Sequence, residues 1–152
     1  MSQIDFITNA PGLFSTLSPD QKPIWGKMNA QQVVEHLSDF FRLSTGEIEF
    51  PLSVPEEHLP KFREFLFSEK MFRENTKAPS NVMPEEPAEI RNSDFESAIS
   101  ELKNAVLSFE HYFIDNPEAT TLHPAFGPLD KHGWLTLHYK HTHHHLRQFG
   151  LL

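Results

Sequence analysis

Apolar residues recur along much of this chain with the three- and four-residue spacing of amphipathic helices. The clearest example follows Ser93–Glu96, whose composition is that of a capping box and predicts the start of a helix. Its apolar positions repeat in steps of four and three: Phe95, Ile99, Leu102, Val106, Phe109 and Phe113. Asp115–Pro117 predicts its end, and the pattern is typical of a helix that packs along one seam of a bundle.

A second helix is predicted from about residue 30 to Ser44, ahead of Gly46. Asn29 is a good N-cap, and Gln32 stands three residues later, where a capping box requires it. One face of this helix carries apolar side chains with a histidine among them: Val33, His36, Leu37 and Phe40. Other positions are assigned to its polar surface: Gln32, Glu35, Ser38, Asp39 and Arg42.

The remaining helical segments are shorter or less regular. Residues 4–17 favour one or two short helical pieces interrupted by Pro11–Gly12, because proline removes a backbone donor. Residues 61–75 favour a helix with these buried positions: Phe62, Phe65, Leu66 and Phe72. Asp130 is a candidate N-cap for a last helix that ends at Gly150.

Proline-rich stretches at 47–60 and 78–92 predict irregular connections, and residues 123–128 predict a rigid loop. A connection as long as 78–92 often covers a site. The chain shows no convincing alternation of the kind that predicts a strand. We therefore expect an all-α protein: a four-helix bundle with short extra helical segments, forming a single domain over residues 1–152.

Composition narrows the classes of function. The length of 152 residues suits one core, and 14 Phe indicate a core built on Phe and Leu. A formal net charge of −8 disfavours nucleic acid and anionic membranes as partners, because both attract basic surfaces. The absence of cysteine excludes disulfides, a thiolate nucleophile and a Cys-ligated zinc site. No signal peptide or membrane-spanning run is evident, so we expect a cytoplasmic protein.

Five histidines crowd into residues 138–145 of the last predicted helix. On a wheel of about 100° per residue, four side chains fall within about 60° of one another: Trp134, His138, His141 and His145. His143 points to the opposite side, where we expect it to face solvent. Since a buried imidazole needs a hydrogen bond or a metal, this histidine-bearing face predicts a metal site inside a helical bundle.

His141 and His145 stand one helical turn apart, a spacing that lets two imidazoles bind one metal. His36 lies on the core face of another helix, so three nitrogens converge if the two helices are neighbours. Three neutral nitrogen ligands suit Zn²⁺, Ni²⁺ or Fe²⁺ and leave positions for water or substrate. His138 could replace a ligand or support one, and His144 lies at the edge of the face. Alternatively, His36 is an ordinary hydrogen-bonded core residue.

For some other polar and aromatic side chains, both a functional and a structural role are considered. His123 could carry protons, but a role as a loop brace is favoured. Trp25 could line a pocket, although core packing is favoured. Gln148 lies near the inner face of the last helix and could orient a ligand or contact substrate. Glu35 points about a quarter-turn away from His36, so we do not assign it as a base.

Residues 28–37 and 141–148 resemble the two histidine motifs of the DinB/YfiT-like superfamily. Three other features resemble a DinB-like family of unknown function: Trp25, the loop His123–Gly127 and the ending His144–Gly150. The resemblance covers residues 25–46 and 123–152. It implies an up-down-down-up four-helix bundle that holds a divalent transition metal on His36, His141 and His145.

The expected function is that of a metal-dependent enzyme acting on a small molecule. A thiol-transferase reaction fits the resemblance best, because some relatives resemble transferases that use a low-molecular-weight thiol such as bacillithiol or mycothiol. Other relatives resemble isomerases, and the resemblance does not imply a substrate. A bound metal would lower the pKa of a thiol or of water, but hydrolysis would also need a carboxylate base, and none stands beside the histidine motif. Two alternatives stay open: a non-catalytic metal- or small-ligand-binding bundle, which could be a homodimer, and a metal-free domain with a polar histidine network.

Overall fold

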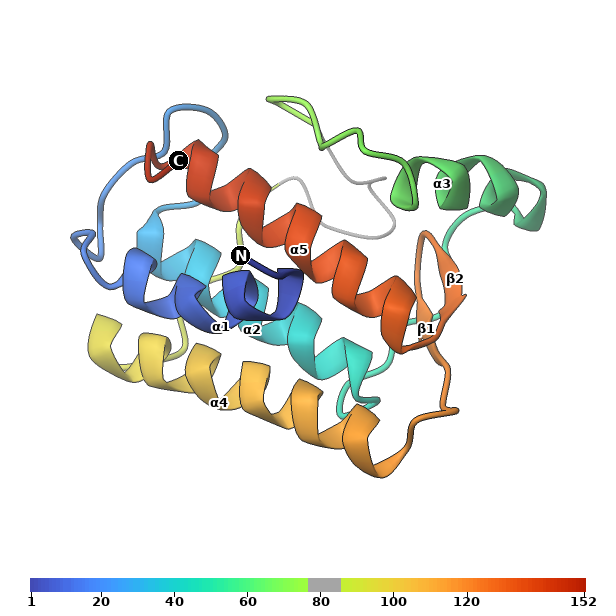
Figure 1. Cartoon of the computed structure of the whole chain (residues 1–152). Helices are drawn as coiled ribbons and strands as arrows, with labels where there is room; N and C mark the ends of the chain where they lie inside the picture. Colours follow the sequence, from blue (N-terminus) through green and yellow to red (C-terminus); the bar gives the residue numbers. More distant parts are fainter. Residues whose placement is uncertain (77–85) are drawn as a thin grey trace.

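The computed structural model describes residues 1–76 and 86–152 (Figure 1). Within these ranges the chain is mostly helical, with five α-helices, one 3₁₀ turn and one two-stranded antiparallel sheet. In chain order the elements are α1 (Gln3–Phe14), α2 (Ala30–Ser44), η1 (Glu56–His58), α3 (Leu59–Leu66), α4 (Phe95–Asp115), β1 (Thr121–His123), β2 (Gly127–Leu129) and α5 (Lys131–Gln148).

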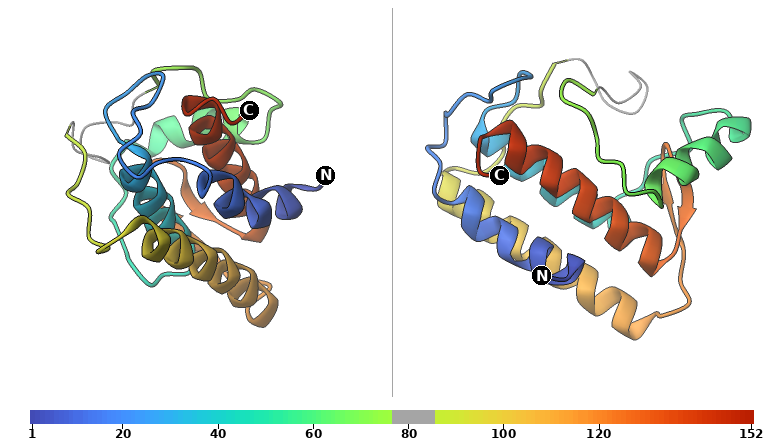
Figure 2. Two further views of the ribbon diagram at one scale, coloured as in Figure 1. Left: turned by 90° about the vertical axis from the view of Figure 1, so that its left-hand side faces the viewer. Right: turned by 45° about the horizontal axis from the view of Figure 1, so that its top comes forward.

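Helices α1, α2, α4 and α5 lie side by side, whereas α3 and the sheet lie at one end of them (Figures 1 and 2). Helix α2 packs along α4, and α1 packs against both α4 and α5. Helix α2 also contacts α5, and this contact brings together residues far apart in the sequence. The core between the helices is rich in aromatic side chains, including the fully buried Phe14, Phe41, Phe109, Phe113 and Trp134.

The predicted start of α2 is confirmed. The Asn29 side chain accepts a hydrogen bond from the Gln32 backbone, and the Gln32 side chain accepts one from the Asn29 backbone, each at 2.9 Å. The predicted polar surface is partly wrong, since Glu35 is only 4% exposed and Ser38 is fully buried. The chain at Arg91 and Asn92 crosses this side of α2 and covers Glu35, which no helical wheel could reveal.

The ends of α4 and α5 agree with the prediction to within about two residues. The N-cap of α4 is Asp94, whose carboxylate accepts a hydrogen bond from the Ser97 backbone at 2.7 Å; the predicted cap, Ser93, lies one residue too early. Asp130 caps α5 as predicted, accepting from the Gly133 backbone at 2.9 Å. Gly150, with φ of +72°, follows the end of α5.

The predicted interruption of the first helix is wrong, because α1 runs through Pro11 without a break. Pro11 stands near the end of the helix and lacks the N–H that would bond back to the preceding turn. Its ring is buried, as are Ile7 and Phe14 on the same helix. Burial of this apolar face outweighs the loss of one backbone hydrogen bond.

The predicted helix over residues 61–75 is wrong at its far end, because α3 already ends at Leu66. The cause is Lys140 on α5, whose ammonium group donates to the carbonyls of Phe65, Ser68 and Lys70. These bonds hold the chain in a non-helical path after Leu66. Of the predicted core positions Leu66 is buried, while Phe62, Phe65 and Phe72 are only partly buried against the core.

The all-α prediction is wrong for residues 121–129, where the expected rigid loop is a small β-hairpin. His123 pairs with Gly127, and Gly127 adopts φ of +75°, which favours glycine. Arg63 of α3 donates to the carbonyls of Phe126 and Pro128 and so holds the hairpin from outside. Strands of three residues are too short to leave an alternating pattern in the sequence.

The predicted irregular connection at 78–92 lies partly outside the described residues, and residues 86–92 contain no helix or strand. In the described part of the chain, no helix combines the length and apolar character needed to cross a membrane.

Candidate metal centre

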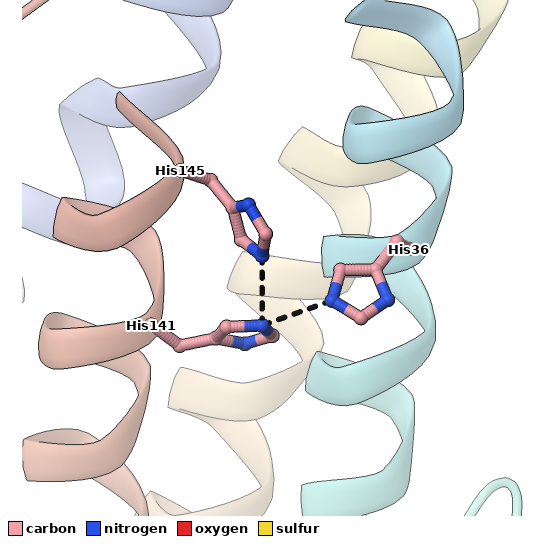
Figure 3. Close-up of side chains that lie close together, drawn as sticks. All are labelled: His36, His141 and His145. Atoms are coloured by element: carbon pink, nitrogen blue, oxygen red, sulfur yellow. Dashed lines mark hydrogen bonds between the residues drawn. The ribbon is translucent and has the colours of Figure 1, made fainter. Parts of the chain in front are cut away.

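The imidazole rings of His36, His141 and His145 point toward one another between α2 and α5 (Figure 3). The Nε2 atom of His141 lies 2.9 Å from Nε2 of His36 and 3.1 Å from Nε2 of His145. One potential ligand atom from each residue lies within 4.8 Å of the other two. A tetrahedral ion with bonds of about 2.0–2.1 Å would hold its nitrogens about 3.3 Å apart, which is close to the two observed contacts.

The contacts among these three rings cannot all be hydrogen bonds. Nε2 of His141 carries either one proton or one lone pair, so only one of its two contacts is an ordinary hydrogen bond. In the other contact, two lone pairs face each other or one proton is shared among three nitrogens. A cation between the rings would engage all three lone pairs, so the donor set fits a metal.

Gln148 fixes the orientation and tautomer of His145. The Gln148 amide nitrogen donates to the Trp25 carbonyl at 2.8 Å, so the amide oxygen faces His145. His145 Nδ1 therefore donates its proton to that oxygen at 2.7 Å, which leaves the Nε2 lone pair directed at the other two rings. Gly26 permits this close approach, because a Cβ there would lie 2.7 Å from the Gln148 amide nitrogen.

Burial keeps the three rings uncharged. Burial, together with the nearby His144, lowers the pKa of His36 to about 4. Burial is also the largest cause that holds the pKa values of His141 and His145 well below the usual range, with neighbouring histidines adding to it. Phe40 contributes to this apolar setting, with its ring centroid 4.9 Å from that of His36 and 5.0 Å from that of His141. Neutral imidazole is the form that binds metals.

His138, the predicted competitor, lies away from the group of three. Its ring stacks on Phe41 at 3.9 Å between centroids and also stacks on Trp134 at 5.4 Å. Its Nε2 atom has no hydrogen-bond partner among the residues that the structure describes. His143, expected to face solvent, is instead half-buried and stacked against Phe6 of α1.

His123 braces the hairpin, as the favoured interpretation predicts. Its Nδ1 accepts hydrogen bonds from the backbones of Ala125 at 2.9 Å and Phe126 at 3.2 Å, so its proton is on Nε2. Burial lowers the pKa of His123 to about 3, which keeps the ring neutral.

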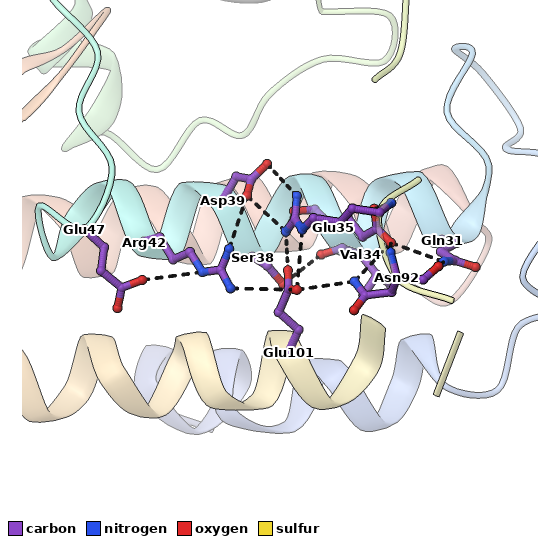
Figure 4. A network of polar contacts seen from close by, with 10 residues as sticks. Gln31, Val34, Glu35, Ser38, Asp39, Arg42, Glu47, Asn92 and Glu101 are labelled. Carbon is purple, nitrogen blue, oxygen red and sulfur yellow. Dashed lines mark hydrogen bonds and ion pairs between the residues drawn. The ribbon is translucent and has the colours of Figure 1, made fainter. Parts of the chain in front are cut away.

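Glu35 is turned away from His36, as predicted, but it is buried, which the sequence did not predict. Its carboxylate accepts hydrogen bonds from Gln31 and from both the backbone and the side chain of Asn92 (Figure 4). The Arg91 backbone donates to it at 2.8 Å. Burial alone would raise the pKa of Glu35, but these hydrogen bonds outweigh it and the pKa lies below its usual value. Glu35 therefore anchors the segment before α4 as a carboxylate.

Lys140 was also missed, and nothing in its local sequence could have indicated its role. It is only 3% exposed although it carries an amine. Its partners are backbone carbonyls 70 or more positions away, which only the folded structure brings near. Burial lowers the pKa of Lys140.

Fold and site together define a mostly helical protein with a candidate three-histidine centre between two helices. The chain belongs to a family described as "Protein of unknown function (DUF1569)", which matches residues 13–150. No curated protein and no solved structure matches the chain.

This family match overturns the resemblance to the DinB/YfiT-like superfamily, which was wrong. The two motifs that carried the resemblance, residues 28–37 and 141–148, centre on a histidine on an apolar face and a pair of histidines four residues apart. Any helical three-histidine site needs those features, so they specify a chemistry rather than a family. The ligand set no longer draws on the resemblance and rests on the geometry alone.

Proposed function

We propose that this protein binds one divalent transition metal through the Nε2 atoms of His36, His141 and His145, and that the metal serves catalysis on a small molecule. The observation that carries the proposal is the convergence of three neutral imidazoles. His145 is buried and oriented by Gln148, and His36 and His141 are partly buried. In this proposal α1, α2, α4 and α5 form a four-helix bundle, with the metal bridging α2 and α5.

Three nitrogen donors suit Zn²⁺, Ni²⁺ or Fe²⁺ and leave room in the coordination sphere. A metal bound there would lower the pKa of water or of a thiol in an open position. Glu35, the carboxylate nearest in sequence to His36, is engaged by Arg91 and Asn92 and is not placed to act as a base. This favours an external thiol as the nucleophile over hydrolysis, and the chain itself supplies no cysteine.

A second candidate is a non-catalytic metal-binding role. His36 and His141 are 105 positions apart, so a metal on both would tie α2 to α5 and stabilise their packing. The two candidates share the metal site and differ in turnover.

Metal content tests the proposal. Elemental mass spectrometry on untagged protein is expected to find about one equivalent of a transition metal, lost in a His36→Ala/His141→Ala variant. A His111→Ala/His132→Ala variant is the matched control, because both of these histidines are exposed. No metal after reconstitution with Zn²⁺, Ni²⁺ and Fe²⁺, or equal metal in all three proteins, would overturn it. Thiol-dependent turnover of electrophilic substrates then separates the catalytic from the structural candidate.

A further inference from the structure

We infer that Trp25 and His144 form a ligand-binding pair beside the metal, an inference that rests on the proposed metal site. The pair would take a small ligand that coordinates the metal through oxygen and carries both a hydrogen-bond acceptor and a donor, as a carboxamide or hydroxamate does.

His144 borders the group of three. Its ring centroid lies 5.1 Å from that of His145, and the side chain is only 8% exposed.

Trp25 packs edge-on against His144, with the two ring centroids 5.6 Å apart. Its backbone is fixed at the end of α5 by two hydrogen bonds of 2.8 Å, one from the Gln148 amide to the Trp25 carbonyl and one from the Ile24 backbone to the Gln148 carbonyl. The oxygen of the same Gln148 amide group accepts a hydrogen bond from His145. The indole is therefore held in a set relation to a proposed metal ligand.

Both side chains carry a buried polar atom without a partner. Trp25 Nε1 and His144 Nδ1 have no hydrogen-bond partner anywhere in residues 1–76 and 86–152. In this proposal the Phe72 carbonyl, the backbone acceptor beside His144, takes the ring proton from Nε2, which leaves Nδ1 as an acceptor. Trp25 Nε1 can only donate. Because buried polar atoms are normally paired, a neighbouring donor and acceptor beside a metal site indicate a ligand with the opposite pattern.

Two other histidines with unpartnered atoms lack this setting. His138 Nε2 lies in the aromatic core beside Phe41 and Trp134. His143 Nδ1 belongs to a ring stacked on Phe6, on the side of α5 that faces α1. His143 thus provides a control on the same helix, adjacent to His144 in sequence.

The test uses full-length protein loaded with Co²⁺, whose visible absorption reports on its ligands, and acetohydroxamate as the probe. His144→Phe and Trp25→Phe should each retain one equivalent of Co²⁺ but bind acetohydroxamate about tenfold more weakly, as expected for loss of one hydrogen bond. His143→Phe should bind it like the unaltered protein. His144→Asn, which restores a side-chain acceptor, should recover part of the lost affinity.

The outcomes separate this inference from the proposed function. If the unaltered protein binds no Co²⁺, both are overturned. If Co²⁺ binds but the probe does not, or the probe binds equally to the His143→Phe, His144→Phe and Trp25→Phe variants, the pair is refuted and the metal site stands. Loss of Co²⁺ from His144→Phe alone would make His144 a metal ligand and would also refute the pair. Far-UV circular dichroism verifies that each variant is folded.

Discussion

His145 and Gln148 lie one turn apart on α5, and the imidazole Nδ1–H donates to the amide oxygen at 2.7 Å. The amide nitrogen of Gln148 donates to the Trp25 carbonyl, so the amide group cannot flip and present its nitrogen to His145. The pair therefore sets which nitrogen of His145 faces His36 and His141. The group that accepts a hydrogen bond from the other ring nitrogen of a histidine ligand strongly affects how tightly that histidine binds metal.

Gln148→Leu removes that partner. We expect metal affinity to fall by about 10- to 100-fold, the usual cost of losing an outer-shell partner, while the stoichiometry at saturation stays at one. Gln148→Glu is the matched control, because it keeps an acceptor for His145 and should bind metal more tightly than Gln148→Leu. Competition with a chromophoric chelator measures both, and equal affinity of the two variants would refute the orienting role.

Single ligand variants provide a second prediction. His36→Ala or His145→Ala is expected to reduce metal affinity by more than the about 10- to 100-fold expected for an outer-shell residue, because a coordinate bond is lost. The helical fold should remain, since the core aromatic residues are untouched. Elemental analysis and far-UV circular dichroism give the two readouts. Unaltered metal content in both variants would refute the ligand assignment.

Metal removal should lower thermal stability, because the proposed ion joins α2 to α5. Metal at 100 times its Kd adds about 2.7 kcal/mol of stability, which corresponds to about 5–10 °C in Tm for a chain of this size. Calorimetry with and without a chelator measures the change. The same chelator should leave the Tm of His36→Ala unaffected, and an equal drop in both proteins would point to a different metal site.

Stability of the metal-free protein should depend on pH through His123. Burial lowers its folded pKa to about 3 from a usual value of 6.5, so between these values the unfolded chain binds a proton that the folded chain excludes. Stability should therefore decrease as pH falls below about 6.5, by about 1.4 kcal/mol per pH unit for this one group.

His123→Asn isolates that contribution, because its side-chain oxygen can still accept from Ala125 and Phe126 but does not titrate. Urea unfolding between about pH 7 and pH 4 should give a slope shallower by about 1.4 kcal/mol per pH unit than that of the unaltered protein. The other buried histidines act in both proteins and cancel in the comparison. Identical slopes would show that His123 is not the source.

Lys140→Met tests the anchoring of the chain after α3. The variant keeps the apolar stem but loses three hydrogen bonds to carbonyls, with an expected loss of about 1–3 kcal/mol in stability. Hydrogen exchange should accelerate in residues 65–76 and stay unchanged in α4. Metal content should also be unchanged, since the Lys140 ammonium group bonds to the carbonyls of Phe65, Ser68 and Lys70 and not to a proposed ligand. Uniform acceleration along the chain would instead indicate global destabilisation.

The sequence by itself determined the elements whose signals are local. The Asn29–Gln32 capping box, the apolar repeat of α4 and the Asp130 cap each depend on residues within a few positions of one another. The spacing of His141 and His145 is local in the same sense, because one helical turn places the two rings together in any fold. These features were predicted close to where they are found.

The tertiary structure alone decided everything that depends on contacts between distant segments. Packing of α2 on α5 brings His36 to His141 across 105 positions, and Lys140 ends α3 from another helix. The crossing of Asn92 over Glu35 and the closure of the hairpin at Gly127 have the same origin. The periodic pattern of a sequence describes one helix or strand at a time and does not say which other element it packs against. These contacts therefore appear only when the chain is folded.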